Sequence, residues 1–176
     1  MKNFDEGLAL KILDSREERA RRQEELIKTY NSTLISYVLN SPGIYKNLDI
    51  YQEIFQVGYE EIVSALGENK LHLVYDEKLE KETGPEGYFL VKADAKKVKA
   101  IMCEIENNHK LGRILDIDIF DKDFNQLSRT DLGLEKRSCL VCDEEARICI
   151  RARKHSYEDL VKKIESDWLD YSSSLK

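Results

Sequence analysis

The alternation of apolar and polar positions along the chain predicts a succession of helices and strands. Apolar residues at every third or fourth position indicate amphipathic helices, and alternating or β-branched runs indicate strands. Helices are expected at residues 4–13, 15–30, 49–67, 95–108, 144–153 and 157–169. Strands are expected at residues 33–39, 70–75, 88–92, 114–120 and 126–130. The run ILDIDIF at 114–120 is the clearest of the strands.

Short polar side chains mark the starts of several helices, and apolar stripes mark their buried faces. The expected capping boxes and N-caps are Ser15 with Glu18, Asp49, Asp94, and Ser156 with Asp159. The expected inward residues are Leu26, Ile27, Tyr30, Ile50, Ile54, Val57, Ile62, Val98, Ile101, Met102, Ile105, Leu160, Ile164 and Leu169. Because no repeat and no Pro/Gly-rich linker interrupts the pattern, residues 1–176 are expected to form one α+β domain. Its mixed or antiparallel sheet should have about five strands with flanking helices.

Composition narrows the class of protein without naming a function. The 176 residues include 28 Lys and Arg against 34 Asp and Glu, a net charge of −6, which argues against bulk nucleic-acid binding. No stretch approaches the roughly 18 apolar residues of a membrane span. The charged N-terminus is unlike a signal peptide, so we expect a cytoplasmic protein whose four cysteines stay reduced.

The ten arginines fall into two groups, and none lies between residues 23 and 112. The first group is Arg16, Arg19, Arg21 and Arg22, and the second is Arg113, Arg129, Arg137, Arg147, Arg151 and Arg153. The guanidinium group matches phosphate and carboxylate in a bidentate way. The first group therefore either binds an anion or pairs with neighbouring glutamates on a helix surface. The second group surrounds the acidic strand at 114–120.

Asp116 and Asp118 carry the strongest chemical signal in the chain. Side chains two positions apart on a strand point the same way, so both carboxylates should project from one face. Paired carboxylates beside a phosphate site commonly hold Mg²⁺ for phosphoryl or nucleotidyl transfer. The alternative is a solvated polar face of an edge strand. Nearby Gly112, Arg113, Ser128 and Arg129 favour the metal and phosphate interpretation.

Three residues just before this strand have open roles. His109 is either a general base, a phosphate contact or the C-terminal cap of the preceding helix. Glu104 and Glu106 are each a candidate third carboxylate for the metal, and Glu104 is also a candidate base. A purely structural role is the alternative for all three.

Cys139, Cys142, Cys149 and His155 have spacing that includes the C-x₂-C of zinc sites. If one helix held both Cys142 and Cys149, they would lie about 10 Å apart along its axis, too far to share an ion. Zinc would require the helix to begin well after Cys142. We therefore expect small buried thiols rather than a structural Zn²⁺ site, with a redox role as a further alternative.

Six blocks of sequence together resemble the citrate lyase holo-acyl-carrier-protein synthase family, the apo-citrate lyase phosphoribosyl-dephospho-CoA transferases. They are SREERARRQ (15–23), SPGIYK (41–46), GPEGYF (84–89), EIENNHKLGRILDIDIF (104–120), LSRTDLGL (127–134) and RSCLVCDEEARICIRARKH (137–155). The combination is far more specific than any one block. The resemblance extends from about residue 15 to residue 160.

The resemblance implies an activity and a set of roles. The family moves a 2′-(5″-phosphoribosyl)-3′-dephospho-CoA group from 2′-(5″-triphosphoribosyl)-3′-dephospho-CoA to a serine of the acyl carrier protein (gamma) subunit of citrate lyase, releasing diphosphate. It implies a nucleotidyltransferase-like fold with Mg²⁺ on Asp116 and Asp118. The implied phosphate and substrate contacts are Gly112, Arg113, Ser128, Arg129, Arg16, Arg19, Lys46 and Arg137. The candidate bases are Asp118, Glu104 and His109, in that order.

Three rival functions remain at this stage. The same chemistry could load the carrier of malonate decarboxylase. The chain could instead be a non-catalytic zinc-knuckle adaptor, which would not need the two aspartates. A nucleotidyltransferase acting on nucleic acid is disfavoured by the net charge.

Overall fold

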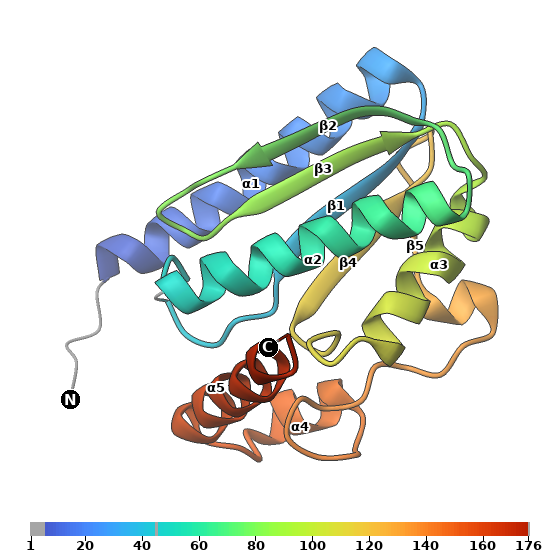
Figure 1. The fold of residues 1–176 in the computed structure, drawn as a ribbon. Helices are drawn as coiled ribbons and strands as arrows, with labels where there is room; N and C mark the ends of the chain where they lie inside the picture. Colours follow the sequence, from blue (N-terminus) through green and yellow to red (C-terminus); the bar gives the residue numbers. More distant parts are fainter. Residues whose placement is uncertain (1–5, 45, 176) are drawn as a thin grey trace.

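Antiparallel strands form the centre of the molecule (Figure 1). The computed structural model describes residues 6–44 and 46–175. Within them, the strands are β1 (Thr33–Leu39), β2 (Leu73–Leu79), β3 (Glu86–Val91), β4 (Leu115–Phe120) and β5 (Gln126–Leu127). They form one sheet in the order β2-β3-β1-β4-β5, and every neighbouring pair is antiparallel. The α+β class and the sheet of about five strands are confirmed.

Helices cover both faces of this sheet. They are α1 (Glu6–Tyr30), α2 (Asp49–Glu68), α3 (Ala95–Asn108), the 3₁₀-helix η1 (Arg129–Leu132), α4 (Ala146–Ala152) and α5 (Tyr157–Ser173). One face packs on α2 and α3, and the other on α1 (Figure 1). The short α4 lies beside α5 near one end of the sheet (Figure 1). None of the described helices is long and apolar enough to cross a bilayer.

The alternation of side chains along β1 and β4 separates two buried clusters. Ile117 and Ile119 point toward α2 and α3 and join the larger cluster. Leu34 on β1 points the other way, toward Leu26 and Ile27 of α1. Asp116 and Asp118 alternate with the isoleucines, so they share the α1 face of the sheet. In the strand pairing, Val38 lies opposite Asp116 and Ser36 lies opposite Asp118.

The first helix differs from the prediction. The pattern predicted a break between residues 13 and 15 with Ser15 as a cap, but α1 runs without interruption through Ser15. Ser15 is buried, and its hydroxyl donates to Glu86 and accepts from Thr83. These tertiary partners take the place of the helix N–H that a capping hydroxyl would bind. Residues 4 and 5 of the predicted first helix lie outside the described residues.

Two strands have limits that differ from the predicted ones, and two of the predicted helix N-caps are confirmed. The strand predicted at 70–75 lies at 73–79, because the charged residues after Tyr75 pair with β3. The strand predicted at 126–130 stops at Leu127, where Ser128 starts η1. The Asp94 and Ser156 caps are confirmed, whereas Asp49 is the first helical residue and Leu48 occupies the cap position.

Most predicted inward faces are buried, with one exception on α5. Ile164 is buried, but Leu169, predicted to face inward, is 63% exposed. Trp168 and Tyr171, on the neighbouring positions of the helix, pack against the core instead. The helix also continues four residues beyond its predicted end, to Ser173.

Candidate functional site

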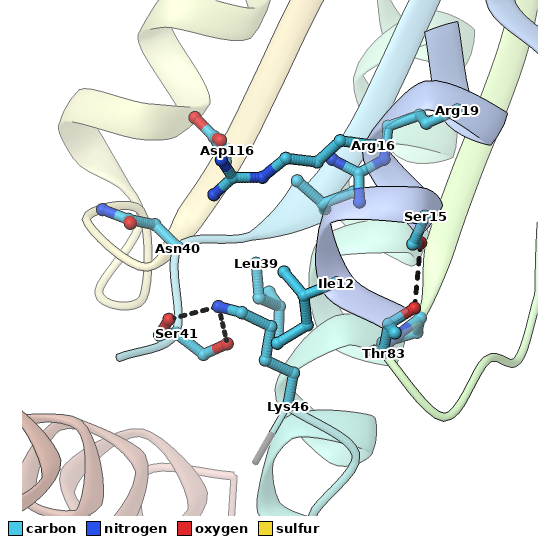
Figure 2. A pocket seen from close by; sticks show the side chains of 13 residues that line it. Ile12, Ser15, Arg16, Arg19, Leu39, Asn40, Ser41, Lys46, Thr83 and Asp116 are labelled. Atoms are coloured by element: carbon cyan, nitrogen blue, oxygen red, sulfur yellow. Dashed lines mark hydrogen bonds between the residues drawn. The ribbon is translucent and has the colours of Figure 1, made fainter. Parts of the chain in front are cut away.

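A pocket opens on the α1 face where β1 ends (Figure 2). Its volume is about 140 Å³. It brings together side chains from α1, from the end of β1, from the turn before β3 and from β4. They are Ile12, Ser15, Arg16, Arg19, Val38, Leu39, Asn40, Ser41, Lys46, Thr83, Gly84, Pro85 and Asp116. Three cations and one carboxylate therefore line the same space.

Arg16 and Arg19 reach this pocket from adjacent turns of α1. Their spacing of three residues places them on one side of the helix. The Arg19 guanidinium lies 3.0 Å from Oε1 of Glu86, which is 1% exposed. Tyr88 donates to the other carboxylate oxygen of Glu86 at 2.6 Å. Arg19 is thereby held in place, whereas Arg16 has no ion-pair partner among the described residues.

Lys46 completes the cationic side of the pocket. Its ammonium group donates to the backbone oxygen of Ser41 at 2.6 Å. Burial lowers the pKa of Lys46, and the positive charges of Arg16 and Arg19 lower it further. Gly84, at φ +106°, lies against it, and a Cβ there would come within 3.1 Å of the Lys46 Cβ. The pocket thus concentrates positive charge that a bound anion would neutralise.

Asp116 and Asp118 differ in their surroundings. The Asp116 side chain is 42% exposed, and its Oδ1 lies 3.0 Å from Nη1 of Arg137. Asp118 is more deeply buried, and burial raises the pKa of its carboxyl group, as does the nearby charge of Asp116. Two carboxylates that repel each other in this way form a donor set that a hard divalent cation would relieve. Among the described residues, no third carboxylate, Cys or His joins them.

Arg137 acts as a bridge between Asp116 and the chain before β4. Its Nη2 donates to the backbone oxygens of Gly112 and Arg113, at 3.2 Å each, and to that of Leu115. The same nitrogen lies 3.8 Å from Oε1 of the buried Glu106. Arg137 therefore fixes both the Asp116 carboxylate and the entry to the strand that carries it.

Arg129 and Arg113 lie near Glu106 rather than in the pocket, and Arg147, Arg151 and Arg153 are exposed on or next to α4. Nη1 of Arg129 donates to Glu106 Oε2 at 2.9 Å, while Oε1 accepts the backbone N–H of Ile117 at 3.2 Å. Burial lowers the pKa of Arg113, and the charges of Arg137 and Arg129 lower it further. Nε of Arg113 is buried and has no hydrogen-bond partner among the described residues.

Gly112 has a steric role in this arrangement. A Cβ at Gly112 would lie 2.5 Å from the backbone oxygen of Glu106 and 2.6 Å from that of Ile105. Only glycine lets the chain pass this close to the end of α3. The predicted substrate contact at Gly112 does not line the pocket.

Three further predicted residues lie outside the pocket. Ser128 caps η1, where its hydroxyl accepts the N–H of Asp131. Glu104 is exposed on α3. His109 is the C-terminal cap of α3 and accepts the Leu111 N–H at 3.1 Å, and its ring contacts that of Tyr171 at a tilt of 51°, with 5.2 Å between the ring centroids. Burial lowers the pKa of His109.

The four possible metal ligands near α4 lie closer together than the sequence analysis expected. That analysis held that Cys142 and Cys149 could not share an ion if both lay on one helix, but α4 begins at Ala146, after Cys142. The ligand atoms of Cys139, Cys142, Cys149 and His155 lie within 4.8 Å of one another. The condition that the sequence argument set for a shared ion, a helix that begins after Cys142, is therefore met.

Sequence reasoning named Glu106 only as a candidate metal carboxylate and did not name Glu86, so it missed that both glutamates are buried and orient arginines. Glu86 lies inside GPEGYF and Glu106 inside EIENNHKLGR, both blocks that were singled out for their resemblance. The signal that was available is an acidic residue within a strand or on the inward side of a helix, where charge is costly unless it is paired.

The fold and the pocket together define an α+β protein with a pocket lined by three cations and Asp116. The sequence profile described as apo-citrate lyase phosphoribosyl-dephospho-CoA transferase matches residues 9–171. The chain belongs to this family.

Individual relatives agree with that assignment. A probable apo-citrate lyase phosphoribosyl-dephospho-CoA transferase of Vibrio cholerae is 36% identical over 162 residues, 92% of this chain and 91% of that protein. The Escherichia coli transferase of the same name is 32% identical over 155 residues, 88% of this chain and 85% of that protein. The "Protein CitXG" of Haemophilus influenzae is 37% identical over 155 residues, which is 88% of this chain but 33% of that longer protein.

Proposed function

We propose that the chain attaches the phosphoribosyl-dephospho-CoA prosthetic group to the acyl carrier protein subunit of citrate lyase. Membership of the transferase family supports the reaction class. The observation that carries the proposal is the pocket in which Arg16, Arg19 and Lys46 face Asp116. A triphosphate needs concentrated positive charge of this kind, and a transferred phosphoryl group needs it most as diphosphate departs.

In the proposed reaction, a serine oxygen of the carrier attacks the phosphorus attached to the ribose of 2′-(5″-triphosphoribosyl)-3′-dephospho-CoA. The new P–O bond forms a phosphodiester, and the bond to diphosphate breaks. The serine proton leaves to a base. Asp118 is the proposed base, because it shares the α1 face of the sheet with Asp116, although only Asp116 of the two lines the pocket. Glu104, exposed on α3, and His109, at the C-terminal cap of α3, are weaker candidates because neither is on the strand that carries Asp116.

We further propose that Asp116 and Asp118 hold Mg²⁺ and that the domain is nucleotidyltransferase-like. The two carboxylates supply oxygen ligands, and substrate phosphate and water would supply the rest. When bound, the ion would neutralise charge on the attacked phosphorus and on the leaving diphosphate. Arg137 would orient Asp116, while Arg16 and Lys46 would bind phosphate oxygens directly.

The test combines the full chain, Mg²⁺, the triphosphate precursor and apo carrier subunit, and follows the mass increase of the carrier. Asp116→Asn and Asp118→Asn should abolish transfer with the fold retained. Arg16→Gln should raise KM about 10- to 150-fold, because a hydrogen bond to a charged group contributes about 1.5–3 kcal/mol. Arg21→Gln, an exposed arginine of α1 outside the pocket, is the matched control and should leave KM unchanged.

Each outcome bears on a separate part of the proposal. Transfer by Asp116→Asn at most of the wild-type rate would refute the acidic site. Equal KM changes for Arg16→Gln and Arg21→Gln would remove the pocket from substrate binding. A chain that loads the malonate decarboxylase carrier, and not the citrate lyase carrier, would assign the rival substrate.

A further inference from the structure

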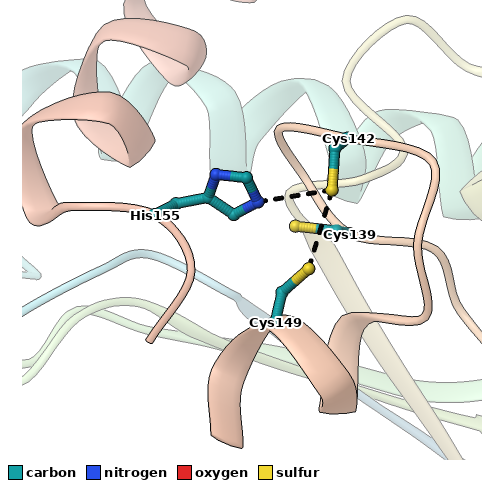
Figure 3. Close-up of side chains that lie close together, drawn as sticks. All are labelled: Cys139, Cys142, Cys149 and His155. Atoms are coloured by element: carbon teal, nitrogen blue, oxygen red, sulfur yellow. Dashed lines mark hydrogen bonds between the residues drawn. The ribbon is translucent and has the colours of Figure 1, made fainter. Parts of the chain in front are cut away.

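Four side chains outside the pocket converge on one point (Figure 3). Cys139 and Cys142 come from the loop before α4, Cys149 from α4 itself and His155 from the turn before α5. Sγ of Cys142 lies 3.6 Å from Sγ of Cys149 and 3.3 Å from Nε2 of His155. All four ligand atoms lie within 4.8 Å of one another.

These separations match a tetrahedral zinc site. With Zn–S bonds of about 2.3 Å and Zn–N bonds of about 2.0 Å, tetrahedral angles place two sulfurs about 3.8 Å apart and a sulfur and a nitrogen about 3.5 Å apart. The observed distances at Cys142 lie close to both values. A disulfide between Cys142 and Cys149 would instead need about 2.05 Å between the sulfurs.

The loop that carries the first two cysteines is shaped to present thiolates. The N–H of Cys139 donates to the Glu144 oxygen at 2.6 Å, and an isolated β-bridge joins Ser138 to Glu145. The N–H of Val141 points back at Sγ of Cys139 at 3.5 Å. Backbone donors to a sulfur stabilise its charged form and orient it, as the outer partners of metal ligands do.

Apolar packing does not account for the cluster. Cys149 is the one buried residue of α4, all of whose residues the structure describes. Ile148 and Ile150 on either side of it are 54% and 70% exposed. A seven-residue helix that buries a single thiol has little hydrophobic burial to hold it. A small segment of this kind commonly relies on a metal ion.

We propose that Cys139, Cys142, Cys149 and His155 bind one structural Zn²⁺. Binding converts the three thiols to thiolates, with their protons released to solvent, and uses a neutral His155. Four protein ligands leave no open position, so the ion stabilises rather than catalyses. It ties the loop, α4 and the start of α5 into one unit.

The ion would also support the pocket from a distance. The Ala146 N–H donates to the backbone oxygen of Arg137 at 2.9 Å. The start of α4 therefore helps to fix Arg137, the residue that pairs with Asp116. On α5, the ring of Tyr157 lies against Gly43, where a Cβ would come within 2.6 Å of it. Gly43 belongs to the loop between Ser41 and Lys46 of the pocket.

The primary test is the metal content of the full chain purified without chelators. We expect about one zinc per chain. Cobalt replacement should give sulfur-to-metal charge-transfer absorption and the intense visible bands of a tetrahedral ion. Cys142→Ser and Cys149→Ser should lose zinc, whereas Cys103→Ala, a buried cysteine of α3 outside the cluster, should keep it. These readouts do not depend on the proposed transfer activity.

A second readout covers the case in which the serine variants do not fold. Chelation of the wild-type chain should lower its melting temperature and open residues 137–155 to trypsin at the exposed Arg147, Arg151 and Arg153, and added zinc should reverse both effects. Absence of zinc from the wild-type chain together with no uptake on titration would overturn the proposal. Zinc retained by both serine variants, or stoichiometric iron in place of zinc, would overturn it as well.

Discussion

Replacing Glu106 by Gln should weaken the whole arrangement that carries Asp116. The Glu106 side chain is 5% exposed and that of Arg129 is 14% exposed, so their 2.9 Å ion pair is largely shielded from water. One carboxylate oxygen accepts the Ile117 N–H and the other accepts Arg129. Gln keeps a single acceptor oxygen, and its NH₂ would face a donor on whichever side it turned.

The size of the effect follows from burial. A solvent-exposed pair would contribute no more than about 1 kcal/mol. Removing one partner of a buried pair costs about 3–5 kcal/mol, because the remaining charge stays desolvated. In a chain of this length each kcal/mol shifts the melting temperature by about 2–4 °C. Glu106→Gln should therefore lower the melting temperature by roughly 6–20 °C.

Thermal and urea unfolding followed by circular dichroism measure this change. Glu104→Gln is the matched control: it removes the same charge from an exposed position of the same helix and should alter the free energy of unfolding by less than about 0.5 kcal/mol. A Glu106→Gln chain whose free energy of unfolding lies within about 1 kcal/mol of the wild-type value would refute the assignment of Glu106 as the anchor of these arginines.

Two other positions give independent predictions. Gly112→Ala should lower the free energy of unfolding by about 1–3 kcal/mol in urea titrations, since its Cβ meets the backbone of α3, while Gly67→Ala, with open space around it, should not destabilise the chain. For His109, the lowered pKa means that its stabilising contribution is complete above the ordinary value near 6.5 and is lost as the pH falls toward the lowered folded pKa. Melting temperatures from pH 7.5 down to pH 5 should accordingly fall more steeply for the wild type than for His109→Asn, and exposed His72→Asn should follow the wild type; parallel curves for all three would contradict this.

Local patterns predicted those elements whose own residues decide the structure. The alternation ILDIDIF gives β4, and the caps at Asp94 and Ser156 act within three residues of themselves. Ser15 has the same local spacing but sits inside a continuous helix, because Glu86 and Thr83 lie next to it in the fold. The capping rule fails where long-range partners bind the same hydroxyl.

The sequence indicated which residues could line the pocket, but not which of them the fold would bring together. Arg16, Arg19, Lys46 and Asp116 were all named from the sequence, and the fold brings them together. Arg129 had equal claim on chemical grounds, yet it faces Glu106 on the other side of β4. Nothing in the spacing of residues distinguishes an arginine that binds a buried glutamate from one that lines a pocket.

The two buried glutamates explain how an acidic chain presents a cationic site. Glu86 forms an ion pair with Arg19, and Glu106 forms one with Arg129, so the charges of both buried acids are paired inside the structure. Arg137 in turn is committed to Asp116. Among the described residues, Arg16 and Lys46 face the pocket without an ion-pair partner. The net charge of −6 thus describes the outer surface, whereas the pocket's potential is set by which arginines the buried acids have already neutralised.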